Sequence, residues 1–304
     1  MSITFDARAD HVAPEPSKPP RTSWELPAAA NKVSRGLRSA LRHVVMTPVR
    51  SSATTGRGVQ LAVATIGYAV LDVATLRVAL GEFLIQAWTL LKVTAIPAML
   101  MAIPFGAMVS VQGSGLISQM GATSLVGAGS AVAVIRQGAP IVAGLLMGGA
   151  AAAAIASDLG ARAIREELDA LRVMAVNTTR YLVVPRFLAL IVISPILCIT
   201  IITAAVTASF VLAVTVNDVS GGSFWMSFGT FARPVDVWFT IGKTVLFAGI
   251  VAIISCLRGM EAKGGPRGVA DAVNSSVVLN VVCIAIANLA VTQLQTMFAP
   301  MEVS

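Results

Sequence analysis

The sequence has little charge and few of the residues that build soluble enzyme sites. Only 12% of its 304 residues are charged, against about 25% in typical globular chains, and 56% are hydrophobic. The mean hydropathy is +0.81. With two histidines in the whole chain, a metal site made of several histidines is excluded. This composition indicates an integral membrane protein.

The sequence also lacks a recognisable catalytic or nucleotide-binding motif. Cys198, Cys256 and Cys283 lie in or beside apolar runs without metal-ligand spacing, so they are predicted to be small buried hydrophobic residues. Residues 242–244 read Gly-Lys-Thr, but Val237 stands where a phosphate-binding loop requires its first glycine. No zinc motif or serine nucleophile elbow is present either. The chain is therefore predicted to be no enzyme and to bind no metal or cofactor of its own.

The basic residues that are present cluster in three segments. Of the 22 Lys and Arg, nine lie in residues 1–57, five in residues 158–186 and three in residues 258–271. These segments avoid the apolar runs. The net charge of +7 therefore indicates membrane topology rather than a nucleic-acid-binding face.

The N-terminal part, residues 1–57, is predicted to be a cytoplasmic extension. Its first 30 residues contain five prolines among small and polar residues, a composition typical of disorder. Residues 31–57 combine six basic side chains with apolar residues on one helical face, as in a basic amphipathic helix at an anionic membrane surface. A solvated tail without membrane contact is the alternative. No cleavable signal peptide is recognisable, which favours a cytoplasmic N-terminus.

The rest of the chain, residues 58–304, is predicted to be an all-α integral membrane domain. Residues 93–135 carry no charge, and these 43 residues are twice the roughly 20 that a helical span needs, so they hold two spans joined by a turn. Residues 58–91 contain three charges and are predicted to lie in the membrane interface as a bent amphipathic helix. Five transmembrane spans are predicted to follow it, at about residues 93–111, 125–157, 181–216, 237–257 and 272–299.

The second predicted span has two unusual features. Gly144, Gly148 and Gly149 allow helices to approach closely in lipid, so this helix is predicted to be the packing centre of the bundle. Arg136 lies between apolar stretches, where an arginine costs on the order of 2.5–3.5 kcal/mol, so it is expected to face a cavity or a partner. Snorkelling to the outer interface is the alternative for Arg136. Lys243, near the start of the fourth span, is expected to snorkel.

Residues 158–186 form a charged segment, with nine charges between two long uncharged runs. Helical spacing predicts a short amphipathic helix at about residues 160–176 with an acidic patch, and Asp158 is a plausible N-cap. A solvated connector held by its own ion pairs is the alternative. The predicted apolar face comprises Ile164, Leu168, Leu171 and Ala175, and the predicted ion pairs, four residues apart, join Arg162 to Glu166 and Arg165 to Asp169.

The distribution of positive charge predicts the orientation. With five spans, the three basic segments fall on one side of the membrane. The other side has only Arg233, in a predicted loop at residues 217–236. The positive-inside rule therefore assigns the N-terminus and the charged segment to the cytoplasm, and the C-terminus to the outside.

Residues 162–189 resemble the MlaE/YrbE permeases of lipid-transporting ABC systems. The likeness lies in Glu-Glu-Leu-Asp-Ala-Leu at 166–171 and Tyr-Leu-Val-Val-Pro-Arg at 181–186, and it extends from about residue 83 to residue 298. The run Gly-Gly-Pro at 264–266, followed by Ala-Val-Asn at 272–274, is most similar to the actinobacterial YrbE subunits encoded with Mce proteins.

The resemblance implies a permease subunit that moves hydrophobic lipids, such as fatty acids or sterols, across the plasma membrane. In this family the acidic helix after the second span is a coupling helix that docks on a separate ATPase, which holds the ATP and magnesium. The implied partners are that ATPase, a second permease in a homo-dimer or, more in keeping with this sequence, a hetero-dimer, and Mce proteins on the outer side. The implied ATPase-coupling residues are Glu166, Glu167, Leu168, Asp169 and Leu171.

The sequence departs from the family pattern in three places, and other functions stay open. The departures are at residues 136–140, 147–152 and 174–178, where Met-Ala-Val-Asn-Thr replaces Met-Gly-x-Asp-Pro. A second permease with complementary features is one hypothesis for them. A lipid pathway needs apolar walls and few polar anchors, and Arg136 is the candidate anchor for an acidic headgroup. The alternatives to import are an exporting or retrograde phospholipid-trafficking permease and a non-transporting anchor for Mce proteins.

Overall fold

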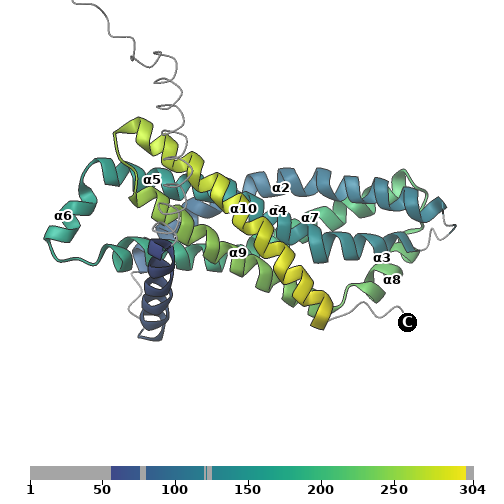
Figure 1. Cartoon of the computed structure of the whole chain (residues 1–304). Helices are drawn as coiled ribbons and strands as arrows, with labels where there is room; N and C mark the ends of the chain where they lie inside the picture. Colours follow the sequence, from purple (N-terminus) through teal and green to yellow (C-terminus); the bar gives the residue numbers. More distant parts are fainter. Residues whose placement is uncertain (1–55, 76–79, 120, 122–124, 299–304) are drawn as a thin grey trace, which may run out of the picture. The chain divides into compact units, whose positions relative to one another are not determined.

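The computed structural model describes residues 56–75, 80–119, 121 and 125–298, and these residues are helical with no strand (Figure 1). The chain divides into two units, residues 1–54 and 55–304, and the described residues belong to the second. The predicted N-terminal extension lies almost wholly outside them. The all-α membrane fold class is confirmed: six of the described helices are long and apolar enough to cross a membrane, one more than predicted.

The additional helix is Gly56–Ala74, called the first helix below. It has 19 residues and a mean hydropathy of 1.2, the lowest of the six. The prediction that residues 58–91 form one bent helix is wrong in its second half, because the chain from Leu80 onward belongs to the next, much longer helix. The interfacial position of the first helix itself stays a prediction.

That longer helix is α2, Leu80–Gln119. Its 40 residues, at about 1.5 Å each, are about twice as long as the hydrocarbon core is thick. The predicted span at residues 93–111 is therefore only its middle. The Lys92 ammonium lies 4.9 Å from the ring centroid of Trp88, a pairing of residue types typical of the membrane interface. α2 is thus long enough to extend beyond the hydrocarbon core.

The second span is one helix, Val126–Ile164, and it is the packing centre as predicted. Two thirds (67%) of its most apolar window is buried, against 44% in the next most buried span. A Cβ at Gly144 would come within 2.9 Å of Ile284 and Phe247, and one at Gly148 within 2.8 Å of Ile284. Its segments are α3 Val126–Ala131, the π-helical η2 Val132–Gly138, α4 Ala139–Leu146, the π-helical η3 Met147–Ala151 and α5 Ala152–Ile164.

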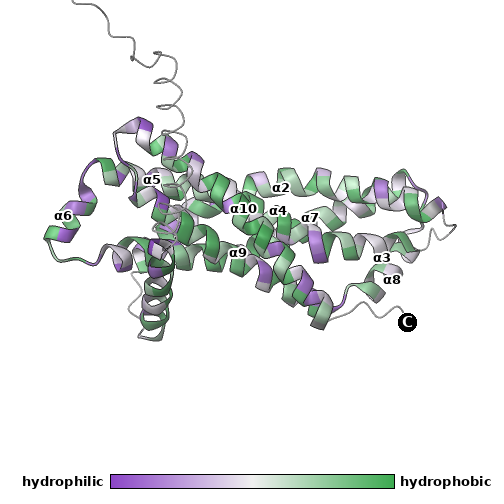
Figure 2. Cartoon of the chain, in the orientation of Figure 1, coloured by the Kyte–Doolittle hydropathy of each residue, from purple (hydrophilic) through white to green (hydrophobic). Residues whose placement is uncertain are grey.

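The remaining spans begin and end close to the predicted residues. Proline opens two of them, because a proline in the first turn sacrifices no helical hydrogen bond. Gly264 and Gly265, with φ of 84° and 78°, make the turn before the last helix in a region that favours glycine. Figure 2 shows the apolar character of these helices. They are η4 Thr179–Val183 with α7 Val184–Thr215, then α9 Pro234–Met260 and α10 Pro266–Phe298.

The predicted loop at residues 217–236 is wrong over most of its length, because it contains the helix α8, Gly221–Phe231. Ser220 caps α8: its hydroxyl accepts a hydrogen bond from the Ser223 N–H. Phe224 is fully buried, and its ring lies 5.3 Å from that of Phe210 in α7. Aromatic packing against α7 therefore makes a helix of a segment rich in glycine and serine.

Candidate functional site

The charged segment forms a hairpin whose tip is α6, Glu167–Val173. α5 ends at Ile164, and Glu166 adopts a left-handed backbone with φ of 60°. The predicted single helix at residues 160–176 is therefore wrong: the chain turns at Arg165 and Glu166, so that α6 lies beyond the ends of α5 and α7 (Figure 1). A left-handed non-glycine residue costs about 1–2 kcal/mol, which the packing of α6 has to offset.

The two faces of α6 differ as the sequence predicts. Leu168 is buried and Leu171 is partly buried, and both pack against the hydrophobic core of the bundle. Glu166 and Asp169 are exposed, and Glu167 is partly exposed. The hairpin tip therefore presents carboxylates outward while two leucines hold it against the bundle, and Figure 2 shows the hydrophilic colour on α6.

The ion pairs of the hairpin differ from the predicted ones, because the turn at Glu166 breaks the helical register. Arg162 Nε lies 3.3 Å from Asp158 Oδ1, so Asp158 is a residue inside α5 and not a helix N-cap. Arg165 pairs instead with Glu167, at 3.1 Å. On α6 itself, Arg172 Nη1 lies 2.8 Å from Asp169 Oδ1. These exposed pairs contribute only about 0–1 kcal/mol each.

An ion pair between a buried arginine and a partly exposed carboxylate closes the base of the hairpin. Arg186, at the start of α7, is fully buried, and its guanidinium donates to the Asp158 carboxylate of α5 and to the Leu182 carbonyl. These two side chains are the first and last charges of the charged segment, 28 residues apart. This one ion pair thus joins the two ends of the hairpin to each other. Helical spacing along the sequence does not predict it.

The second arm of the hairpin is also attached to the first helix. The side-chain oxygen of Asn177 accepts from the N–H groups of Thr179 and Arg180, which caps the helical turn that opens η4. Its amide donates to Tyr68 Oη at 3.2 Å. Arg180 pairs with Asp72, whose carboxylate is buried. The departure from the family pattern at residues 174–178 therefore coincides with a capped turn and a tertiary contact.

A second group of charges lies inside the bundle around Arg136, in η2. Arg136 Nε lies 2.9 Å from Asp236 Oδ1, and Nη2 donates to Oδ2 at 3.1 Å, so the pair is bidentate. Gln295 of α10 donates to the same carboxylate at 3.4 Å. Arg136 is 9% exposed and Asp236 2%. The expectation of a partner is confirmed, and the snorkelling alternative is wrong.

Lys243 belongs to the same buried group, which contradicts the prediction that it snorkels. It is 1% exposed, and its ammonium donates to the Arg136 carbonyl at 3.3 Å and to the Thr292 hydroxyl at 3.2 Å. α9 turns this side chain toward η2 and α10, away from the membrane interface. The buried group therefore combines two basic side chains with one carboxylate.

Comparisons with known proteins give a consistent result. The sequence model of a family described as "Permease MlaE" matches residues 83–294. A protein of Rickettsia bellii named "Probable ABC transporter permease protein" is 29% identical over 189 residues, which are 62% of this chain and 73% of that protein. A protein of Synechocystis sp. with the same description is 29% identical over 168 residues, 55% of this chain and 64% of that protein.

A plant protein is similar over a shorter share of its length. "Protein TRIGALACTOSYLDIACYLGLYCEROL 1, chloroplastic" of Arabidopsis thaliana is 29% identical over 171 residues, 56% of this chain and 49% of that protein. The matched region of the family covers α2 to α10, and thus both the hairpin and the buried charges around Arg136.

Proposed function

Because this chain belongs to the MlaE permease family and is an ABC transporter permease, we propose that it moves hydrophobic lipids across the plasma membrane with energy from a separate ATPase. The cargo is a fatty acid, a sterol or a related lipid, handled in an Mce-type system. The glycerolipid in the name of the Arabidopsis relative supports a lipid cargo. The mostly apolar spans favour such a cargo too, because long apolar groups require apolar walls.

The observation that carries this proposal is the build of α6. An exposed acidic helix at the tip of a hairpin offers a surface to a partner, and its buried Leu168 connects that surface to the bundle. In the proposed complex Glu166, Glu167 and Asp169 contact the ATPase, while Leu168 and Leu171 position the helix. The ATPase holds ATP and magnesium, and this chain holds no cofactor.

The proposed assembly contains a second permease, an ATPase dimer and Mce proteins. The N-terminus and the hairpin lie in the cytoplasm, where the ATPase is, and the C-terminus lies outside with the Mce proteins. Departures of this chain from the family pattern favour a hetero-dimer in which the second permease differs. The basic residues of the charged segment support this orientation.

Charge reversal on α6 tests the coupling role. The triple variant Glu166→Lys, Glu167→Lys, Asp169→Lys should lose the ATPase in a pull-down from membranes that contain the whole complex, because the acidic face becomes basic. The matched control is Asp218→Lys, an exposed carboxylate in the loop at the opposite end of the bundle (Figure 1). Unchanged co-purification of the ATPase with the triple variant would refute the coupling role.

Arg136 is the proposed anchor for an acidic lipid headgroup. Its guanidinium is held by Asp236, so a headgroup would have to take the place of that carboxylate. Arg136→Ala should reduce transport of a carboxylated lipid more than transport of a neutral one, measured with tracer lipids in proteoliposomes. Equal transport of both lipids at the wild-type rate would remove Arg136 from the pathway.

Two other functions predict different results. A retrograde or exporting permease would move tracer lipid in the other direction, from the cytoplasmic side to the outer side of the same membranes, instead of accumulating it inside. A non-transporting anchor for Mce proteins would leave lipid movement intact when the ATPase is catalytically dead. The family supports a permease, which is why coupled transport is preferred.

A further inference from the structure

The first helix carries one buried carboxylate on an otherwise lipid-compatible surface. Asp72 is 5% exposed and lies on the same side as the buried residues Thr65 and Ala69. The opposite side of the helix exposes large apolar side chains, among them Val63 and Leu71. A carboxylate buried among apolar groups is costly unless it is paired, so the contacts of Asp72 decide how this helix is attached.

Those contacts go to the arm of the hairpin that follows α6. Arg180 Nε lies 3.0 Å and 3.1 Å from the two carboxylate oxygens of Asp72, and Arg180 Nη2 also donates to Oδ1. One turn earlier on the first helix, Tyr68 accepts from Asn177. Both partners lie within residues 177–180, between α6 and α7. The first helix is therefore joined to the arm of the hairpin that leads from α6 to α7.

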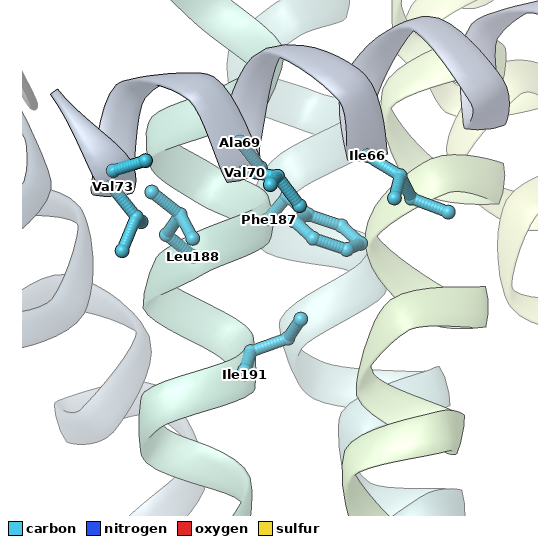
Figure 3. Close-up of a pocket in the computed structure, with 8 residues that line it drawn as sticks. Ile66, Ala69, Val70, Val73, Phe187, Leu188 and Ile191 are labelled. Carbon is cyan, nitrogen blue, oxygen red and sulfur yellow. The ribbon is translucent and has the colours of Figure 1, made fainter.

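Apolar packing between the first helix and α7 is incomplete beside these polar contacts. A groove of about 600 Å³ separates the two helices there. Figure 3 shows the first helix running across α7, with Val73 and Val70 above Leu188, Phe187 and Ile191. The contacts of Tyr68 with Asn177 and of Asp72 with Arg180 join the first helix to the hairpin in the same region as this groove.

We infer that Asp72 and Arg180 transmit the movement of the hairpin to the first helix, so that ATP hydrolysis in the ATPase docked at α6 displaces this helix across α7 and changes the groove. The inference rests on the proposed coupling role of α6. Asp72 and Arg180 are positioning residues, because they act through the helix that they connect. A displaced helix changes the space open to lipid beside Phe187 and Ile191.

The test compares lipid moved per ATP hydrolysed in proteoliposomes that contain the intact complex. Asp72→Asn and Arg180→Gln should each lower this ratio by at least about fivefold, the lower end of typical coupling between sites. The double variant should be no worse than either single one, because both remove the same link. The matched control is Glu82→Gln, which removes the charge of a carboxylate that accepts from Gln86 within α2.

A second measurement separates transmission from general stability. Spin labels on the first helix and on α7 should report a distance change between the nucleotide-free and ATP-bound states, and Asp72→Asn should abolish it while the melting temperature and the bound ATPase stay unchanged. Three results would each overturn the inference. The single variants could keep the wild-type ratio of lipid moved per ATP hydrolysed, or the double variant could show the sum of the two single losses. Asp72→Asn could also keep the wild-type distance change between the spin labels. Those outcomes leave the coupling role intact, since that role fails only if the α6 triple variant retains the ATPase.

Discussion

Asp236→Asn should destabilise the protein more than Arg136→Met, although the two residues form one ion pair. In the wild-type protein the Asp236 carboxylate lies within a buried group that also contains Lys243. Arg136→Met leaves one carboxylate and one ammonium in this group. Asp236→Asn instead leaves two basic side chains and no carboxylate. Asp236→Asn is therefore the more destabilising change, because Lys243 keeps a counter-charge only when Asp236 is present.

The magnitude follows from the cost of breaking a buried pair. Removing one partner costs about 3–5 kcal/mol, because a charge remains buried without its counter-charge. Arg136→Met should fall at the lower end of this range, since Lys243 still offers a positive charge to Asp236. Asp236→Asn should reach the upper end, because Arg136 and Lys243 then repel each other. Replacing both, as Arg136→Met with Asp236→Leu, should cost less than Asp236→Asn, because one buried ammonium is then left in place of two basic side chains that repel each other.

The free energy of unfolding, from titration with sodium dodecyl sulfate in mixed micelles, measures these differences. The control, Glu82→Gln, lies outside the group and should change stability by less than about 0.5 kcal/mol. Equal losses for Arg136→Met and Asp236→Asn would show that Lys243 does not balance the pair. A double variant as unstable as the sum of the two singles would refute the account of the pair itself.

Two further changes test the packing and the hairpin. Gly144→Ala should destabilise the protein by about 1–3 kcal/mol, because the new Cβ would lie 2.9 Å from both Ile284 and the buried Phe247 ring, whereas Gly149→Ala, where a Cβ meets nothing within 4 Å, should be neutral or stabilising; unfolding titrations that rank them equally would contradict the close approach. Asp158→Asn should cost about 1–3 kcal/mol, because the buried Arg186 loses its counter-charge although the Asp158 side chain is itself 40% exposed, and protease cleavage of the hairpin should accelerate; an unchanged cleavage rate would show that this pair does not close the base.

Much of the architecture could be predicted from the sequence because it depends on composition over about 20 residues. Long uncharged runs predict spans at nearly the residues where the helices lie, and Gly144 and Gly148 indicate where two helices touch. The acidic outer face of α6 is also a local property, since Leu168 and the carboxylates beside it alternate within a single turn.

The backbone departs from the helix predicted by periodic spacing at a single residue, where the chain turns. Glu166 adopts a left-handed backbone conformation, which a glutamate side chain does not favour and the sequence therefore does not indicate. Helical spacing predicted one continuous helix through this turn, so the predicted ion pairs were wrong. α8 shows the opposite error, since a loop was predicted where the structure has a helix. Its glycines and serines are typical of a loop, but the Ser220 cap and the burial of Phe224 against α3 and α7 stabilise a helix there.

The sequence by itself determined that this is a helical membrane protein, that its second span is the packing centre, and that a charged segment interrupts the apolar runs. Tertiary structure alone decided which charges meet. Arg136 finds Asp236 one hundred residues away, and Arg180 finds Asp72 across 108 residues. The physical reason is that a charge in an apolar interior must be paired, and the fold decides which charge lies near enough to pair with it. The separation of two residues along the sequence does not predict how far apart they lie in the folded protein.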